Sequence, residues 1–194
     1  GRELVKSAFF LSILAWVVML LYVTVRFKWD YAISCIVALV HDVLIVIAIF
    51  AIFRMEVNIE LISVILAIIG YSINNSIVVF DRIRSAVKET EGDLSADVYR
   101  QIVNDSLYKT FTRSVYSSIT TLLPVICLLI LGSNAIITFN FAMFVGLIAG
   151  TISSMFVAPV VWYWLRTKYK PRPKKVRKVV KEELDELEIE GINY

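Results

Sequence analysis

The sequence predicts an all-α polytopic membrane protein, a bundle of five transmembrane helices, and three observations support this fold class. The 194 residues are 58% hydrophobic and only 19% charged, a balance that is rare among water-soluble domains. The apolar residues form long runs, each close to the roughly 20 residues that a helix needs to cross a bilayer. These runs lack the regular apolar and polar alternation of strands, so strands are not indicated.

The membrane-spanning runs define a transmembrane domain over residues 1–166. In chain order they cover residues 4–25, 31–53, 59–80, about 112–132 and 138–165. Aromatic side chains gather at the ends of the first and fifth runs, as in the belts that anchor membrane proteins at the bilayer surface. Each run is therefore interpreted as one crossing.

Two charged segments lie outside these runs. Residues 81–111 form a loop in which we expect a short amphipathic helix from about Ser95, lying along the cytoplasmic surface. Residues 167–194 form a tail whose basic half precedes an acidic half. The basic half could attract anionic lipid headgroups or ribosomal RNA, but an ordinary positive-inside anchor is the favoured interpretation, and no specific nucleic acid is expected.

The placement of lysine and arginine predicts the orientation. With five crossings, 17 of the 20 basic residues fall on one side of the membrane and 3 on the other. The richer side is cytoplasmic by the positive-inside rule, which places the C-terminus inside and Gly1 outside. Because the chain has no initiator methionine and no signal-peptide pattern, we expect residue 1 to continue from an extracytoplasmic part of a longer protein.

Enzymatic and metal-dependent functions are not indicated. The chain carries no HExxH, GxSxG or phosphate-binding glycine-rich motif and a single histidine, so no enzyme activity and no cofactor are expected. Cys35 and Cys127 lie in different apolar runs and are interpreted as small core residues rather than as a disulfide or as metal ligands.

His41 and Asp42 place ionisable chemistry near the centre of the second run. A charged aspartate at that depth costs about 2.5–3.5 kcal/mol on insertion scales, so it needs a partner or a proton. Asp42 is either a proton-relay or switch carboxylate or a residue satisfied by a neighbouring helix, whereas His41 is favoured as structural. Since adjacent helical residues point about 100° apart, the two side chains need not pair with each other.

Asn74 and Asn75 form a second polar position, on the third run. An amide without a partner in an apolar medium costs several kcal/mol, on the order of 4–8 against cyclohexane, so both should face other helices or a wet cavity. Amides hydrogen-bond across helices but do not titrate. The favoured interpretation is that they tie helices together. Gly70 and Ser72 on the same run permit close helix approach.

Arg113 begins a polar ridge at the inner end of the fourth run. The ridge continues on one helical face through Ser117, Thr120, Thr121 and Pro124. It could line a hydrated path, and snorkelling of the guanidinium to the interface explains Arg113 equally well. On the fifth run, a GxxxG at Gly146 and Gly150 predicts tight helix packing.

Several motifs together resemble the SecF half of the SecD/SecF protein-export membrane proteins. GYSINNSIVVFDRIR over 70–84 is similar to the third-helix signature of that family, and TRSVYSSITTLL over 112–123 is similar to the motif that follows it. The triplet HDV over 41–43 and the segment over 139–159 also fit. The resemblance extends from residue 1 to about residue 165.

The resemblance implies the C-terminal membrane half of SecF, or of a fused SecDF, in the resistance-nodulation-division superfamily. It implies an accessory subunit of the SecYEG translocase in the cytoplasmic (inner) membrane, driven by the proton gradient and acting on unfolded preproteins. The implied partners are a SecD half, SecYEG and a YidC-type insertase. It places the transport arginine on Arg113, the acid that closes the motif on Asp81, and the proton-carrying acid on Asn75, where this chain has an amide.

Two other functions stay open because of that amide and because the superfamily is broad. One is a proton-driven exporter of lipids or small molecules that shares the helix bundle. The other is a non-transporting partner that stabilises the translocase, which Asn75 favours, with Asp42 or Asp81 as remaining acids.

Overall fold

The computed structural model describes residues 28–56, 59–90 and 95–169, together with scattered positions between 6 and 25. All regular structure in these residues is helical, which confirms the all-α prediction. The first predicted crossing, 4–25, and nearly all of the tail, 167–194, lie outside the fully described part. The described positions between 6 and 25 are helical.

The described helices are α2, α3, α4, α5 and α6, with a short π-helical segment η1 between the last two. Their bounds are Trp29–Ile52, Ile59–Glu89, Ala96–Leu131, Asn134–Ile152, Ala158–Lys168, and Ser153–Val157 for η1. Four stretches in this part are long and apolar enough to cross a membrane: Trp29–Ile52, Glu60–Glu89, Ala96–Leu131 and Ile136–Lys168. These stretches coincide with the second to fifth predicted crossings.

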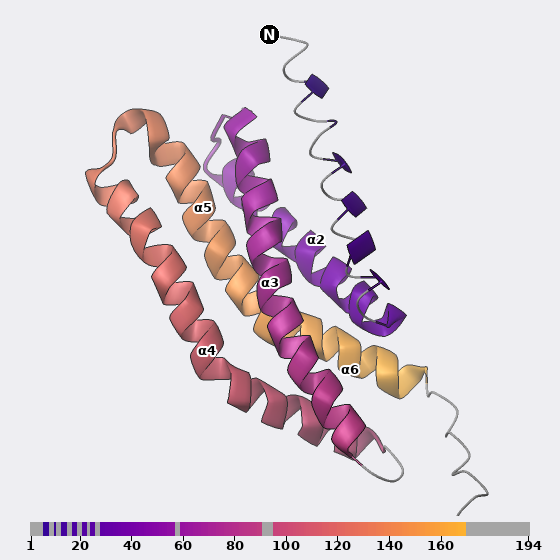
Figure 1. The fold of residues 1–194 in the computed structure, drawn as a ribbon. Helices are drawn as coiled ribbons and strands as arrows, with labels where there is room; N and C mark the ends of the chain where they lie inside the picture. Colours follow the sequence, from indigo (N-terminus) through magenta and orange to yellow (C-terminus); the bar gives the residue numbers. More distant parts are fainter. Residues whose placement is uncertain are drawn as a thin grey trace, which may run out of the picture.

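Helix α4 differs from the prediction of a surface helix followed by a separate crossing. Its start is as expected, because the Ser95 side chain accepts a hydrogen bond from the Val98 backbone N–H at 3.4 Å. The helix then continues to Leu131 without a break. Between residues 96 and 123 it contains no glycine or proline that would stop it, and it also continues past Pro124. Figure 1 shows that α4 bends along its length, and Tyr99, Ile102 and Val103 of its first part belong to a hydrophobic cluster with residues of α2, α3 and α6.

The last predicted crossing is divided into three pieces. Residues 138–165 were expected to form one helix, but η1 separates α5 from α6, and the chain changes direction there in Figure 1. Pro159 follows η1 and has no N–H to bond the carbonyl of Met155, so an α-helical ladder cannot pass unbroken through this point. A π-helical segment absorbs such a break by shifting the bonding to i→i+5.

Helix α3 occupies the centre of the described bundle and contacts α2, α4, α5 and α6. Its packing against α5 involves two glycines. A Cβ atom built on Gly146 would collide with the Ile68 side chain, 2.5 Å from Cγ1, and one built on Gly150 would lie 3.3 Å from Ser72 Cβ. The GxxxG pair therefore packs tightly against α3, as its sequence predicts.

Candidate functional site: a buried polar network

The Asp42 carboxylate lies in the middle of the bundle and is fully buried. Its Oδ2 accepts a hydrogen bond from Ser72 Oγ of α3 at 2.6 Å and another from Ser153 Oγ of η1 at 2.8 Å. A single carboxylate oxygen thus joins three elements. Buried charges in a membrane require such partners, and hydrogen bonds to an ionised acceptor are roughly twice as strong as neutral ones.

His41 completes this cluster, which corrects the sequence-based argument that the two neighbours need not pair. Its Nδ1 lies 3.2 Å from Asp42 Oδ1. The two oxygens of the planar carboxylate face in different directions, so one meets the hydroxyls inside the bundle while the other meets His41. The His41 side chain is 37% exposed, so the imidazole connects the buried acid to the surface of the described bundle.

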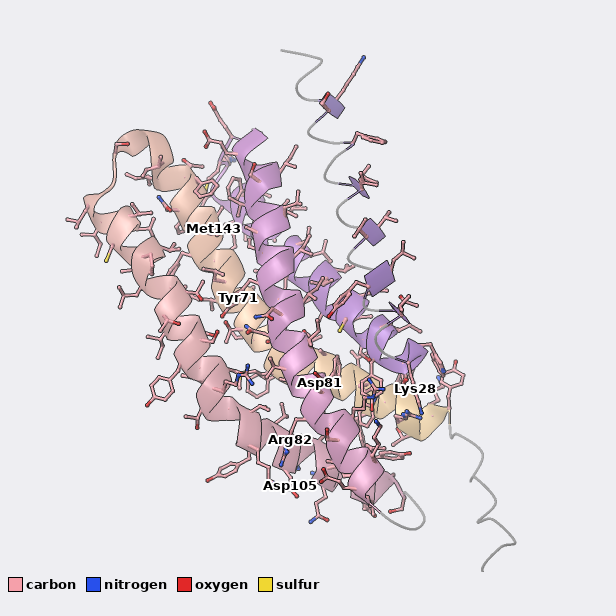
Figure 2. All side chains as sticks on the ribbon, viewed as in Figure 1. Lys28, Tyr71, Asp81, Arg82, Asp105 and Met143 are labelled. Carbon is pink, nitrogen blue, oxygen red and sulfur yellow. The ribbon has the colours of Figure 1, made fainter. Side chains whose placement is uncertain are left out.

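A second cluster of hydroxyls joins α3, α4 and α5. The Tyr71 hydroxyl donates to Ser118 Oγ at 2.7 Å, and Thr151 Oγ1 lies 2.9 Å from Ser118 Oγ and 3.2 Å from the Tyr71 hydroxyl. Figure 2 shows Tyr71 in the middle part of α3. Tyr71 directly precedes Ser72 on α3, and Thr151 near the end of α5 comes two residues before Ser153 of η1, so the two clusters are neighbours in the bundle. No periodic pattern in the sequence predicts this cluster.

The two asparagines on α3 face in different directions. Asn75 is 4% exposed, and within the part of the chain described its Nδ2 has no hydrogen-bond partner. Asn74 is exposed on the described bundle, so of the two amides only Asn75 lies among the described helices. Consecutive helical residues lie about 100° apart, so a narrow buried face accommodates one of them.

Arg113, expected either to line a hydrated path or to snorkel to the interface, lies on the surface of the described bundle. It is exposed on α4, as is Thr120, while Ser117 and Thr121 are half-buried. Thr120 and Thr121 donate to the Ser117 carbonyl of their own helix. The hydroxyl residues of α4 that are buried in the described bundle lie on another face: Ser106, Thr110, Ser114 and Ser118. Because α4 carries polar residues on several faces, spacing alone could not tell which face is inside.

Asp81 lies half-buried on α3, six residues and roughly 9 Å along the helix axis from Asn75. Figure 2 shows Asp81 and Arg82 toward the end of α3 that approaches the start of α4. The predicted site residues are therefore spread over the bundle. Asp42 and Asn75 are buried, Asp81 is intermediate, and Asn74 and Arg113 are on the surface.

An ion pair that the sequence did not predict joins the start of α2 to the end of α6. Arg166 Nε on α6 lies 2.7 Å from Asp30 Oδ2 on α2, and Trp162 Nε1 donates to the same oxygen at 2.9 Å. The Arg166 guanidinium also lies against the Tyr31 and Trp162 rings. An arginine counted only as a positive-inside anchor is here a half-buried residue paired with a buried acid. The sequence signal for this pair is Asp30, an acid directly before the second run.

Long apolar helices around buried acid and hydroxyl clusters define a multi-pass helical membrane protein with a polar interior. The family "Protein export membrane protein SecD/SecF, C-terminal" matches residues 1–168. The chain belongs to this family, as its motifs predicted.

Individual relatives agree with this membership. A protein translocase subunit SecF of Sebaldella termitidis is 42% identical, covering 90% of this chain and 56% of the relative. A subunit SecDF of Bacillus subtilis is 40% identical over 84% of this chain and 22% of the relative. The chain therefore spans about half the length of that SecF and about a fifth of that SecDF.

Solved structures support the same fold. The crystal structure of SecDF from Thermus thermophilus, described as a translocon-associated membrane protein, matches with a TM-score of 0.68 and 42% identity, over 73% of this chain and 19% of that one. SecDF in a super-membrane-facing form matches with a TM-score of 0.70 and 39% identity, over 78% and 20%.

Proposed function

We propose that this chain is the membrane module of an accessory subunit of the Sec translocase, which assists the export of preproteins. The observation that carries this proposal is the family match over residues 1–168, together with 42% identity to a named SecF subunit. The proposed partners are a SecD-type half, the SecYEG channel and a YidC-type insertase, with the unfolded preprotein as substrate. The relatives named above are all translocase subunits, so a role in exporting lipids or small molecules has no comparable support.

The surface position of Arg113 suits a module that works against a second half. A guanidinium near the inner membrane surface is stabilised by a polar neighbour or by reaching the headgroups. Arg113 is exposed in the described bundle, and we assign its functional neighbour to the SecD-type half. The proposed topology places the α3 end at Glu89 and the basic tail in the cytoplasm, where the tail contacts anionic lipids.

The amide at Asn75 favours a second candidate, a subunit that stabilises the translocase with little proton coupling. Asn75 occupies the position at which the resemblance implies a proton-carrying acid, and an amide stays neutral throughout the accessible pH range. Asp42 remains as a fully buried acid inside the described bundle. The two candidates share the same partners and differ in whether the proton gradient drives the subunit.

Depletion of the subunit in its own cells tests the proposed function. We expect unprocessed preproteins to accumulate on depletion and to disappear when the parent gene is supplied again. Normal preprotein processing without the subunit would refute the export role. If the parent gene rescues export, the measurement is repeated after the proton gradient is collapsed. A subunit that only stabilises the translocase should still increase preprotein export, whereas a subunit driven by the gradient should not.

A further inference from the structure

The start of α2 and the end of α6 meet at one corner of the described bundle. Beneath this corner lie the ion pair of Arg166 with Asp30 and the hydrogen bond from Trp162 to the same carboxylate. At its surface the Trp29 and Tyr169 rings make an edge contact, with 6.3 Å between their centroids. The two helix ends are therefore held at a fixed spacing by buried and surface contacts.

Two lysines on this corner have no acid beside them that neutralises their charge. Lys28 directly precedes α2, and Lys168 ends α6 with its Nζ 4.5 Å from the centre of the Trp164 ring. Both lysines are exposed, and within the part of the chain that the structure describes neither forms an ion pair. Helix α6 has no acid in its sequence, and Asp30 in the first turn of α2 is buried against Arg166. Figure 2 shows Lys28 beside the end of α6, so the two positive charges share one surface.

Large aromatic rings surround these lysines. Trp29, Trp164 and Tyr169 are each more than half exposed. Tryptophan and tyrosine favour the boundary between lipid tails and headgroups, because the ring is apolar and its N–H or O–H group needs a polar partner. Two stretches that are long and apolar enough to cross a membrane, Trp29–Ile52 and Ile136–Lys168, have one end at this corner. The corner therefore lies at the level of the lipid headgroups.

We propose that this corner is a binding site for the headgroup of an anionic phospholipid, and we define it by its exposed residues: Lys28, Trp29, Trp164, Lys168 and Tyr169. The lipid phosphate lies between the two ammonium groups, and the rings pack against the glycerol and the upper acyl carbons. Charge asymmetry places the corner in the cytoplasmic leaflet, whose anionic lipids attract basic residues near the membrane. The site is separate from the basic half of the tail, and it does not depend on the export role.

The chemistry of the corner favours a lipid over a free phosphate ion. A free ion gains only the two ammonium groups, whereas a lipid also covers the three exposed rings. Because buried contacts fix the spacing of the two helix ends, binding requires little ordering of the backbone. Phosphatidylglycerol, with its net negative headgroup, should bind better than phosphatidylcholine, whose own cationic group is repelled by the lysines.

The test measures lipid binding by the full-length subunit that carries this chain, purified in a neutral detergent. Phosphatidylglycerol or phosphatidylcholine is added in steps, with and without inorganic phosphate, and native mass spectrometry counts the lipids bound to each copy. We expect the parent to bind a first phosphatidylglycerol at concentrations at which phosphatidylcholine does not bind, and inorganic phosphate should not displace it. The double variant Lys28→Gln, Lys168→Gln should weaken this first step roughly 25-fold, or about fivefold per lysine.

A charge-matched double variant separates the corner from the net charge of the chain. Lys174→Gln with Lys175→Gln removes the same two positive charges from the tail, and it should leave the first binding step unchanged. Trp29→Ala should also weaken that step, because it removes one of the rings that cover the lipid. The side chains replaced at the corner are exposed, so these variants keep the buried contact between Asp30 and Arg166 and should fold as the parent does.

Three results would overturn the proposal. Equal affinity for phosphatidylglycerol and phosphatidylcholine would show an ordinary interfacial belt without a site for anionic lipid. Equal losses in the two double variants would show that the net charge of the chain, rather than the corner, attracts the lipid. Displacement of the lipid by inorganic phosphate would assign the corner to a free anion. Since the measurement needs no preprotein, its failure would leave the proposed export role untouched.

Discussion

The side chains of Asp42 and Asn75 are both buried, but they differ in how far their hydrogen-bonding groups are satisfied. The Asp42 carboxylate is satisfied by Ser72, Ser153 and His41. The Asn75 Nδ2 is buried without a partner in the described chain. An unsatisfied buried polar group costs about 1–3 kcal/mol. The Asn75 amide is therefore a buried hydrogen-bond donor for which the described residues provide no acceptor.

Asn75→Asp tests whether this position limits proton coupling. A carboxylate at position 75 can bind and release a proton, which the amide cannot do. We expect the substituted subunit, reconstituted with its SecD-type partner in vesicles, to show gradient-dependent proton flux above that of the parent. Asn74→Asp is the matched control, because it adds the same acid at the exposed neighbouring position. Equal, robust flux from the parent and from Asn75→Asp would show that the proton path runs elsewhere.

Arg113 should be required for export assistance through its guanidinium rather than through its charge alone. Lysine keeps the charge but loses the planar fork, and a hydrogen bond to a charged group is worth about 1.5–3 kcal/mol. We expect Arg113→Ala and Arg113→Lys to lower export roughly ten- to hundredfold in a strain that depends on the subunit. Arg100→Lys, at another exposed arginine of α4, serves as control. Full complementation by Arg113→Ala would refute the assignment.

The sequence predicted which polar residues matter better than it predicted which of them face the inside of the bundle. Burial of Asp42 and of Asn75 follows from the cost of placing such groups in lipid, and the structure confirms it. The exposure of Asn74 and Arg113 did not follow, because a helix with polar residues on several faces has no unique inside. The Tyr71, Ser118 and Thr151 cluster joins residues up to 80 positions apart. No local pattern encodes such a contact.

At the scale of elements, hydrophobic length predicted the helices but not their continuity. The second to fifth predicted crossings all contain a long apolar helix. Helix α4 continues through a polar stretch because tertiary contacts of Tyr99, Ile102 and Val103 support it there. The last crossing breaks at η1, where Pro159 interrupts the backbone ladder. A proline is visible in the sequence, whereas the π-helical segment before it has no sequence pattern of its own.

The contact between α5 and α3 can be tested at Gly146. A methyl group at this position collides with the Ile68 side chain, and overpacking of this kind costs about 1–3 kcal/mol. We expect Gly146→Ala to lower the unfolding free energy in detergent by that amount, measured from the denaturant midpoint. Ile68→Ala should restore part of the loss when combined with Gly146→Ala. Additive destabilisation by the two changes would contradict the contact.

For the whole molecule, charge asymmetry predicts that Glu56 lies outside and Lys168 inside. The structure places these residues at opposite ends of the bundle, after α2 and at the end of α6, and both are exposed. Single cysteines at the two positions should react with an impermeant thiol reagent from opposite faces of the membrane, in a background lacking Cys127. Labelling of both from the same face would refute the topology.

The most direct measurement of the export role is preprotein transport into vesicles that contain purified SecYEG and its motor. The account predicts that adding the full-length subunit, together with its SecD-type partner, increases the amount of protected preprotein. The partner added alone is the control. Equal amounts of protected preprotein with and without the subunit would contradict the claim that this chain belongs to a component that assists export.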